Sequence, residues 1–299
     1  ISDVAELAGV SYQTVSRVIN NNPNVSAATR QRVKKIIAET GYRPSHIARS
    51  LVTARTATIG LVVPDISNPF FSALARGADE VASKNGYSIL LCNTGEDATR
   101  ETDVLNLLQE RYVDGVIICS SRQDDAPLQE ALAQFGAAVL VNRRLAGAVI
   151  PAVLVDDALG GAMITQHLLQ LGHRAIGFVA GPATSYSGQQ RLAGYQAALD
   201  AADIAPQPSW VRYCLPTTTA GEEAAQGLLA SCPELSALFC YNDLVALGAL
   251  RACAATGHLV PSDIAVTGFD DIMLAGVVSP ALTTCHVPRA AVGSQAVAM

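Results

Sequence analysis

Residues 58–67 read TIGLVVPDIS, and residues 175–184 read AIGFVAGPAT. Each segment joins an apolar run, about as long as one buried strand, to a turn that contains proline. The second copy begins 117 positions after the first. Because an internal repeat usually means that one structural unit is used twice, the pair predicts two similar lobes with a cleft between them.

Further apolar runs of four to six residues surround these two segments and alternate with helical stretches. Buried runs separated by helices are typical of parallel sheets that helices cover on both faces. The sequence therefore predicts an α/β fold with two parallel sheets. The expected strands are residues 59–63, 88–92, 115–119, 138–141 and 152–155 in the first lobe, and 175–180, 210–214, 237–240 and 264–267 in the second.

Polar side chains and two aromatic residues follow the ends of these strands, where open α/β sheets bind their ligands. They lie in residues 65–71, 142–143, 156–157, 187–191, 242–243 and 270–271 and at His286. A sugar needs this mixture, because aromatic faces pack on its C–H surface while amide, carboxylate and guanidinium groups bind its hydroxyls. Alternative roles exist: Phe70 or Phe71 as a core aromatic, Asp243 and Asp271 as helix caps, and His286 as a donor to a backbone carbonyl.

The net charge of −6 on 299 residues hides a division of the chain. Residues 1–55 carry eight basic and three acidic side chains and total +5, whereas the remaining residues total −11. A basic segment joined to an acidic body indicates that this segment binds nucleic acid.

The first 41 residues read as three short helices. In the first helix, Val4, Leu7 and Ala8 fall on one face, and Gly9 ends it. Ser11 caps the second, which buries Val15, Val18 and Ile19, and Ser26 caps the third, which Gly41 ends. Two helices around a glycine turn form a helix-turn-helix; the alternative is a plain three-helix bundle with a solvated polar face.

The second helix is predicted to enter the major groove of DNA. Arg17 suits guanine, Gln13 suits adenine, and the ring of Tyr12 suits bases or the thymine methyl group. The small polar side chains of Ser16, Asn20 and Thr29 suit phosphates and fix the register.

The segments VAELAGVSYQTVSRVIN (4–20), GYRP (41–44) and IARSL (47–51) are the signature of the lactose/galactose repressor family of bacterial transcription regulators, and the whole chain resembles it. The resemblance implies a helix-turn-helix domain over 1–44, a hinge helix and linker over 45–57, and an effector-binding and dimerisation domain over 58–299. The N-lobe would comprise 58–157 and 287–299, and the C-lobe 158–286. In the hinge, Ala48 and Leu51 would contact the minor groove, with Leu51 as an apolar wedge; an ordinary flexible linker is the alternative.

The two lobes resemble the periplasmic ribose-binding protein. Its pocket has the same residue type at Asn68, Phe70, Phe71, Arg143, Arg191, Asn242 and Asp270. Asn142 stands where that pocket has an aspartate, and His286 where it has a glutamine. These nine residues are the expected effector site, and the two departures leave the identity of the sugar open.

The resulting prediction is a homodimeric transcription regulator, a repressor of a sugar-utilisation operon that a sugar-like effector releases from a palindromic operator; a tetramer is left open. The alternatives are a transporter's solute-binding protein and a corepressor-dependent regulator with a purine-like ligand. No catalytic motif is present, so an enzyme is not expected, nor is a cofactor.

The remaining composition excludes several classes of protein. Half of the residues are hydrophobic, which excludes a mainly disordered chain. No apolar run approaches the roughly 20 residues that span a bilayer, and no export signal is visible, so we expect a cytoplasmic protein without a membrane partner. Seven cysteines without a C-x-x-C pair predict free thiols and no metal site. The family usually continues beyond a helix that begins near Pro288, and the initiator Met is absent, so we expect a sequence truncated at both ends.

Overall fold

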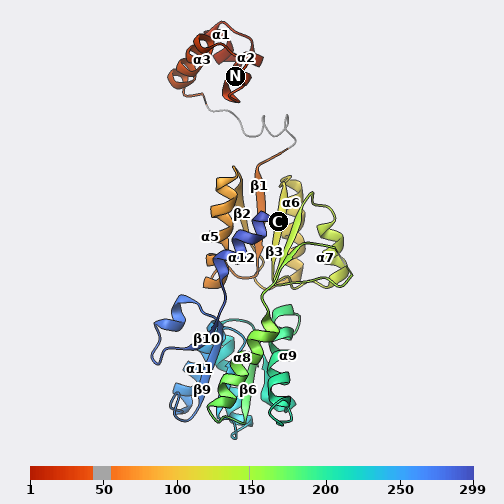
Figure 1. The fold of residues 1–299 in the computed structure, drawn as a ribbon, viewed down its shortest axis with the longest axis vertical. Coiled ribbons are helices and arrows are strands. Elements are labelled where there is room, and N and C mark those ends of the chain that lie inside the picture. Colours follow the sequence, from red (N-terminus) through yellow and green to blue (C-terminus); the bar gives the residue numbers. More distant parts are fainter. Residues whose placement is uncertain (43–54, 148) are drawn as a thin grey trace. The chain divides into compact units, whose positions relative to one another are not determined.

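A computed structural model describes residues 1–42, 55–147 and 149–299. The chain divides into two compact units, residues 1–56 and 57–299, which we call the head and the body (Figure 1). Within the described residues, no helix combines the length and the apolar character needed to cross a membrane.

The head consists of helices α1 (Ser2–Ala8), α2 (Tyr12–Ile19) and α3 (Ala27–Thr40). Gly9 and Gly41 end α1 and α3 with φ angles of 61° and 64°, in the left-handed region that glycine adopts without steric cost. Ser11 and Ser26 cap α2 and α3, as expected, by accepting the backbone N–H three residues ahead at 3.3 and 3.2 Å. A small core of buried side chains joins the helices: Val4, Ala5, Ala8, Val15, Val18 and Val33.

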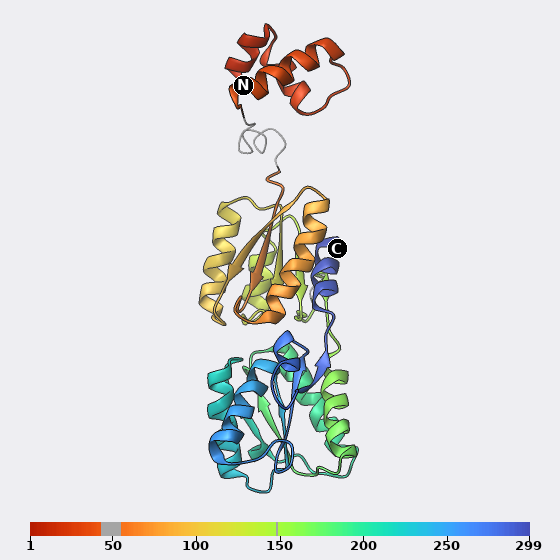
Figure 2. The same cartoon turned by 90° about the vertical axis from the view of Figure 1, so that its left-hand side faces the viewer.

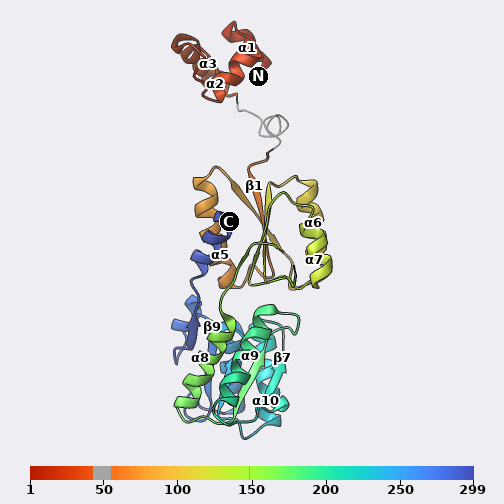
Figure 3. The same ribbon diagram turned by 45° about the vertical axis from the view of Figure 1, so that its right-hand side comes forward.

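The first lobe of the body is a five-stranded parallel sheet with the order β2-β1-β3-β4-β5. Its strands are β1 (Thr58–Val63), β2 (Ser88–Asn93), β3 (Gly115–Cys119), β4 (Ala138–Val141) and β5 (Ala152–Val153). Its helices are α5 (Pro69–Lys84), α6 (Ala98–Glu110), α7 (Asp125–Leu132) and α12 (Arg289–Ala298). Helices α5 and α12 cover one face of the sheet and α6 and α7 the other (Figure 3). We call this lobe the N-lobe.

The second lobe repeats the architecture with the order β10-β9-β8-β6-β7. Its strands are β6 (Ile176–Ala180), β7 (Val211–Tyr213), β8 (Ala237–Cys240), β9 (Ala265–Asp270) and β10 (Thr283–His286). Its helices are α8 (Asp157–Gln170), α9 (Tyr186–Asp200), α10 (Thr218–Ser231) and α11 (Asp243–Thr256), with short 3₁₀ turns at Pro208–Trp210 and Met273–Gly276. We call it the C-lobe; from it the chain returns to the N-lobe, where α12 lies beside α5 (Figure 2).

Two parallel sheets covered by helices confirm the predicted fold class, with local differences in the strands. Strand β5 covers two residues of the expected run 152–155, and β9 extends beyond 264–267 to Asp270. Strand β10 was not among the expected strands, because its sequence, TTCH, is no apolar run. It lies at the edge of its sheet and is half exposed, so it needs no apolar run.

Glycines bring the covering helices of both lobes into close contact in pairs. A Cβ atom on Gly194 of α9 would lie 2.0 Å from the carbonyl oxygen of Ala158 on α8, and one on Gly77 of α5 would lie 2.0 Å from that of Ala290 on α12. On the partner helices, Gly161 of α8 and Gly293 of α12 also lie close to the backbone of the facing helix. At these glycines, each helix pair is therefore too close for a side chain to fit between the two backbones.

Candidate functional site

The head exposes the polar face of α2. Tyr12 is 60% exposed, and Gln13 and Arg17 also project into solvent. The opposite face is closed, because Val15 and Val18 are buried against the other helices. A short helix that is fixed by its apolar side and carries free polar side chains has the form required to enter a major groove.

The predicted phosphate-binding residues flank this face. Asn20 ends α2, and its Nδ2 lies 3.5 Å from Ser16 Oγ one turn back. Thr29 lies in the first turn of α3, where its hydroxyl accepts from Ser26 Oγ at 2.9 Å. Ala48 and Leu51, predicted to contact the minor groove, lie outside the described residues.

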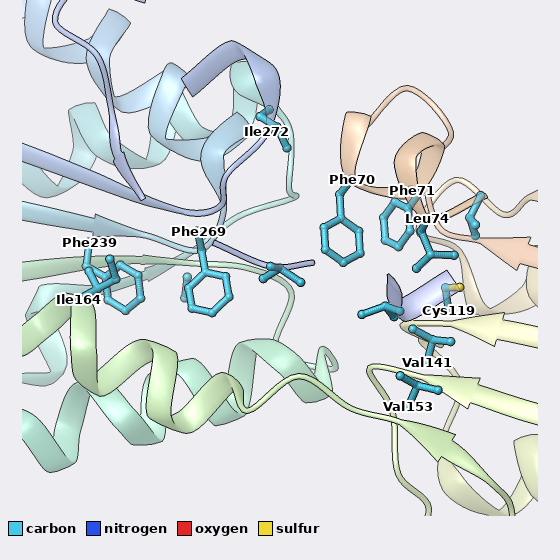
Figure 4. Packing of buried hydrophobic residues seen from close by; sticks show 14 of the residues in the cluster. Phe70, Phe71, Leu74, Cys119, Val141, Val153, Ile164, Phe239, Phe269 and Ile272 are labelled. Carbon is cyan, nitrogen blue, oxygen red and sulfur yellow. The ribbon is translucent and has the colours of Figure 1, made fainter. Parts of the chain in front are cut away.

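The body holds a cleft where the carboxyl ends of the strands of both lobes meet, the place that parallel sheets provide for ligands. The N-lobe contributes the segments after β1 to β4, and the C-lobe those after β6 to β9. Figure 4 shows Phe70 and Phe71 on the N-lobe side and Phe269 on the C-lobe side. The lining residues are Asn68, Phe70, Phe71, Glu96, Ser120, Arg122, Asn142, Ser187, Arg191, Pro216, Tyr241, Asn242 and Asp270.

Arg191, on α9, is the most strongly fixed side chain in the cleft. Its Nε donates to Asp157 Oδ1 at 2.8 Å, and its Nη1 donates to the carbonyl oxygen of Tyr241 at 2.6 Å. Its Nη2 lies 3.5 Å from Asp270 Oδ1, and its guanidinium carbon lies 3.7 Å from the centre of the Phe269 ring. Burial alone would lower the pKa of Arg191, but the carboxylates of Asp157 and Asp270 outweigh it and raise the pKa, so the group stays charged.

Two buried carboxyl groups thus share one guanidinium. Burial, together with the nearby carboxylates of Asp243 and Asp157, raises the pKa of Asp270 to about 7 despite the opposing charge of Arg191. Burial also raises the pKa of Asp157, although Arg191 lowers it. Asp270 therefore gains or loses a proton near neutral pH and can donate a hydrogen bond to a ligand as well as accept one.

The N-lobe side of the cleft carries a second, separate ion pair. Arg122 Nε donates to Glu96 Oε2 at 2.5 Å, and both side chains are more than nine-tenths buried. Burial would lower the pKa of Arg122, whereas the interactions with Tyr241 and Glu96 raise it. Each lobe therefore presents one charged and compensated guanidinium to the cleft.

Three asparagines around the cleft differ in what they leave for a ligand. Asn68 caps α5 by accepting from the N–H of Phe70 at 3.0 Å, and Asn242 caps α11 by accepting from Val245 at 2.9 Å. The two caps use only the amide oxygens, so the NH₂ groups of these cleft-lining residues take no part in them. Asn142 Oδ1 is buried and has no hydrogen-bond partner among the described residues, so it suits a ligand hydroxyl.

Seven of the nine predicted cleft residues line this site: Asn68, Phe70, Phe71, Asn142, Arg191, Asn242 and Asp270. Arg143 and His286 do not. Arg143 Nη2 instead donates to Asp125 Oδ1 at 2.6 Å, and His286 Nδ1 lies 2.7 Å from Asp271 Oδ2 on the exposed edge strand β10. Asp243 caps no helix; its carboxylate accepts from Ile272 N–H at 2.7 Å and from the hydroxyl of Thr284.

Several lining residues were not among the predicted site residues, although the same rule would have found them. Glu96 follows the strand at 88–93, Ser120 and Arg122 follow that at 115–119, and Tyr241 comes directly after that at 237–240. Pro216 lies similarly after β7. In the part of the chain that the structure describes, no three metal-ligating side chains come together.

Comparison with protein families divides the chain as the structure does. Residues 1–45 match the bacterial regulatory proteins of the lacI family, and residues 56–299 match the periplasmic binding proteins and sugar-binding domain of the LacI family. The chain is 37% identical to the ribose operon repressor of Haemophilus influenzae over 99% of this chain and 89% of that protein. It is 36% identical to the transcriptional regulator GalR of Escherichia coli over 99% and 86% of the two chains.

Solved structures agree with the sequence comparisons. The lac repressor dimer bound to operator and the anti-inducer ONPF superposes with a TM-score of 0.89 at 30% identity, over 99% of this chain and 89% of that one. The complex of the regulator CelR with cellobiose gives a TM-score of 0.74 at 35% identity, over 99% of this chain and 90% of that one. The chain belongs to the LacI family of bacterial transcription regulators.

Proposed function

We propose that this chain is a repressor of a sugar-utilisation operon, released from its operator by a small, neutral sugar that binds between the lobes. The observation that carries the proposal is the presence in one chain of an exposed polar helix α2 and a polar, aromatic-lined cleft. A solute-binding protein needs only the cleft. An operator-binding regulator needs both the helix and the cleft. Because such a regulator must reach the bacterial DNA, we propose that it acts in the cytoplasm.

Residues 12–20 supply the sequence-specific contacts in this proposal. Tyr12, Gln13 and Arg17 reach base edges, while Ser16, Asn20 and Thr29 bind phosphates. One head covers a half-site, so the working form is a homodimer on a two-fold symmetric operator. The similarity to the operator-bound lac repressor dimer supports this assembly; a tetramer would pair two such dimers. In the hinge, Ala48 and Leu51 are proposed to enter the minor groove.

The charges of the cleft favour an uncharged effector. Arg122 is compensated by Glu96, and Arg191 by Asp157 and Asp270, so neither guanidinium of the described lining lacks a carboxylate partner. An anionic ligand would have to displace one of these carboxylates. A sugar instead offers hydroxyl groups to Asn142 Oδ1 and Asp270 and apolar C–H faces to Phe70 and Phe71. The ribose operon repressor and the CelR–cellobiose complex among the similar proteins support this class of ligand.

A corepressor with a flat, purine-like ring is a second candidate. The rings of Phe70 and Phe71 meet edge to face with centroids 5.1 Å apart, and one of them can stack on such a ring. The transcriptional repressor PurR of Aliivibrio salmonicida is also among the similar proteins, at 35% identity over 99% of this chain. The direction of linkage separates the candidates, because an inducer weakens operator binding and a corepressor strengthens it.

The test has two parts, one for each site. The full chain is used to select bound sequences from random double-stranded DNA, and the proposal expects a two-fold symmetric site. D-ribose, D-galactose, cellobiose and hypoxanthine are then tested for a concentration-dependent rise in Tm. Selection of no DNA contradicts the regulator, and a rise with hypoxanthine alone contradicts the sugar effector.

A further inference from the structure

Arg122 of the N-lobe lines the cleft together with side chains of the C-lobe. Its Nε is held by Glu96 at 2.5 Å, and its Nη1 donates to the carbonyl oxygen of Ser120 at 2.9 Å, both within the N-lobe. Tyr241, which follows β8 in the C-lobe, lines the same cleft, and its hydroxyl is among the groups that raise the pKa of Arg122. The Tyr241 hydroxyl lies 3.0 Å from Ser185 Oγ, so it is anchored on its own side.

The loop that carries Arg122 is built to hold this position. Ser120 has a φ angle of 50°, an uncommon left-handed conformation for a residue with a side chain. Glu101, buried in the first turn of α6, accepts from the hydroxyl of Ser121 and, at 3.1 Å, from the backbone N–H of Arg122. Burial raises the pKa of Glu101, while these hydrogen bonds oppose the rise. The buried carboxylate of Glu101 thus holds the loop that carries Arg122, and the left-handed conformation of Ser120 is the kind of backbone strain that occurs at functional sites.

Arg143, the guanidinium that the sequence pattern assigned to the N-lobe half of the site, is committed elsewhere. Its Nη2 donates to Asp125 Oδ1 at 2.6 Å and to the carbonyl oxygen of Gln123 at 3.0 Å. It does not line the cleft, whereas Arg122 does. The N-lobe therefore offers a guanidinium to the cleft from the end of β3 instead of the end of β4.

The cleft is closed on its own side chains. It retains a free volume of about 20 Å³, which is room for about one water molecule. Small-molecule pockets commonly measure about 300–1,000 Å³. A ligand therefore enters only if the lobes separate or a lining side chain moves, and the Arg122–Tyr241 interaction is a contact that such a movement breaks.

We propose that Arg122 is the effector-binding and specificity-determining guanidinium of the N-lobe, and that in the effector-free protein it holds the cleft closed through Tyr241. On binding, an effector oxygen replaces the Tyr241 hydroxyl as its acceptor, while Glu96 keeps the guanidinium in place. This inference rests on the proposed function for the presence of an effector, but the contact between the lobes is independent of any ligand.

The first test needs no effector. The Tm of the full chain is measured for Arg122→Met, Tyr241→Phe and the double variant. Tyr241→Phe is expected to lower the Tm of the wild-type protein by a few degrees and to have a clearly smaller effect in the Arg122→Met background. Equal effects in both backgrounds would show that the two side chains do not interact, and the proposed contact would be overturned.

The second test measures the effector affinity. If the two side chains had only a structural role, the two substitutions would not be expected to change this affinity in opposite directions. The probe is whichever of D-ribose, D-galactose and cellobiose raises the Tm of the wild-type protein. Arg122→Met is expected to weaken its binding at least tenfold, whereas Tyr241→Phe is expected to tighten it severalfold because Arg122 is freed. Arg143→Met serves as the matched variant and is expected to change the affinity less than threefold.

Unchanged affinity in Arg122→Met, or a loss in Arg143→Met as large as that in Arg122→Met, overturns the assignment. Weaker binding in Tyr241→Phe shows that this hydroxyl binds the effector itself, which overturns its role as a competitor. If none of the three sugars binds the wild-type protein, the sugar effector proposed above fails and the binding role of Arg122 with it. The Tm comparison then still decides whether Arg122 holds the lobes together.

Discussion

Helix α2 of the head and the cleft of the body present the side chains proposed to be functional in opposite ways. Tyr12, Gln13 and Arg17 project from α2 into solvent and contribute little to the packing of the head. In the cleft, Arg191 is 3% exposed and Asp270 is 5% exposed, and each is part of a buried ionic network. The head therefore separates recognition from folding, whereas the cleft uses the same side chains for both.

Glycine has two different roles in the chain. In the head, Gly9 and Gly41 have positive φ angles, and a Cβ atom on either would meet nothing within 4 Å. In the body, Gly194 and Gly161 lie within helices and have no positive φ angle, but a Cβ atom on either would overlap the backbone of the facing helix. Gly9 and Gly41 are therefore needed for their conformation, as is Gly257 in the body, whereas Gly194 and Gly161 are needed for their small size.

The largest expected effect is the loss of stability in Arg191→Ala. It leaves Asp157 and Asp270 buried without their cation, and breaking such a pair typically costs about 3–5 kcal/mol. Urea unfolding of the full chain measures the change. Arg251→Ala, which removes an exposed guanidinium paired with Glu222, is the control and is expected to cost less than about 1 kcal/mol. A similar loss in both variants would remove the contrast between buried and exposed arginines.

Gly194→Ala is expected to have the next largest effect. The new methyl group would overlap the carbonyl oxygen of Ala158, so α8 and α9 must move apart, at a cost of about 1–3 kcal/mol. Gly276→Ala, where the added atom meets nothing within 4 Å, is the matched control and is expected to be nearly neutral. Thermal unfolding distinguishes them, and an unchanged Tm in Gly194→Ala would show that the helices are not held by close backbone contact.

Arg17→Ala tests the head. A bidentate arginine–guanine contact is worth about 1–3 kcal/mol, so the operator Kd is expected to rise tenfold or more while the Tm stays within about 1 °C. Lys35→Ala removes the same charge from the exposed surface of α3 and is expected to weaken binding less. An equal loss in both variants, measured by fluorescence anisotropy, would reduce the role of Arg17 to general electrostatic attraction.

The cleft is also expected to make the stability of the protein depend on pH. Burial raises the pKa of Asp270 to about 7 from an ordinary value near 3.8. Between these values the folded protein holds a proton that the unfolded chain releases, so the contribution of Asp270 to stability is complete below pH 4 and is lost as the pH rises toward 7. Relative to Asp270→Asn, the wild-type protein should therefore lose up to about 1.4 kcal/mol per pH unit, the limit for one proton. If the unfolding free energies of the wild-type protein and Asp270→Asn changed in parallel with pH, this prediction would be wrong.

Much of the fold follows from local sequence, as α2 illustrates. Ser11 as a cap, Val15 and Val18 as the buried face and Arg17 on the free face all lie within eight residues, so helical spacing alone places them. Leu7 marks the limit of such reasoning, since it was expected on the apolar face of α1 with Val4 and Ala8 but is 63% exposed. In a helix of seven residues Ala5 completes the buried stripe, and no neighbour covers Leu7.

The direction of long side chains in the cleft is not a local property. Arg122 and Arg143 both follow strands, and nothing near either one says which enters the cleft. Glu96, 26 residues away, holds Arg122 there, and Asp125, 18 residues away, turns Arg143 aside. The raised pKa of Asp270 likewise depends on groups from other elements, so it too required the folded structure.

The proposed function requires the two regions to be coupled, so that a sugar in the cleft changes how tightly the head binds DNA. The direct test is the operator Kd of the wild-type protein, measured by fluorescence anisotropy on the selected two-fold symmetric site, with and without a saturating sugar that raises the Tm. Operator binding is expected to be about 5- to 150-fold weaker with the sugar, which is the usual range of allosteric coupling. An unchanged or tighter operator Kd in the presence of a bound sugar would contradict it.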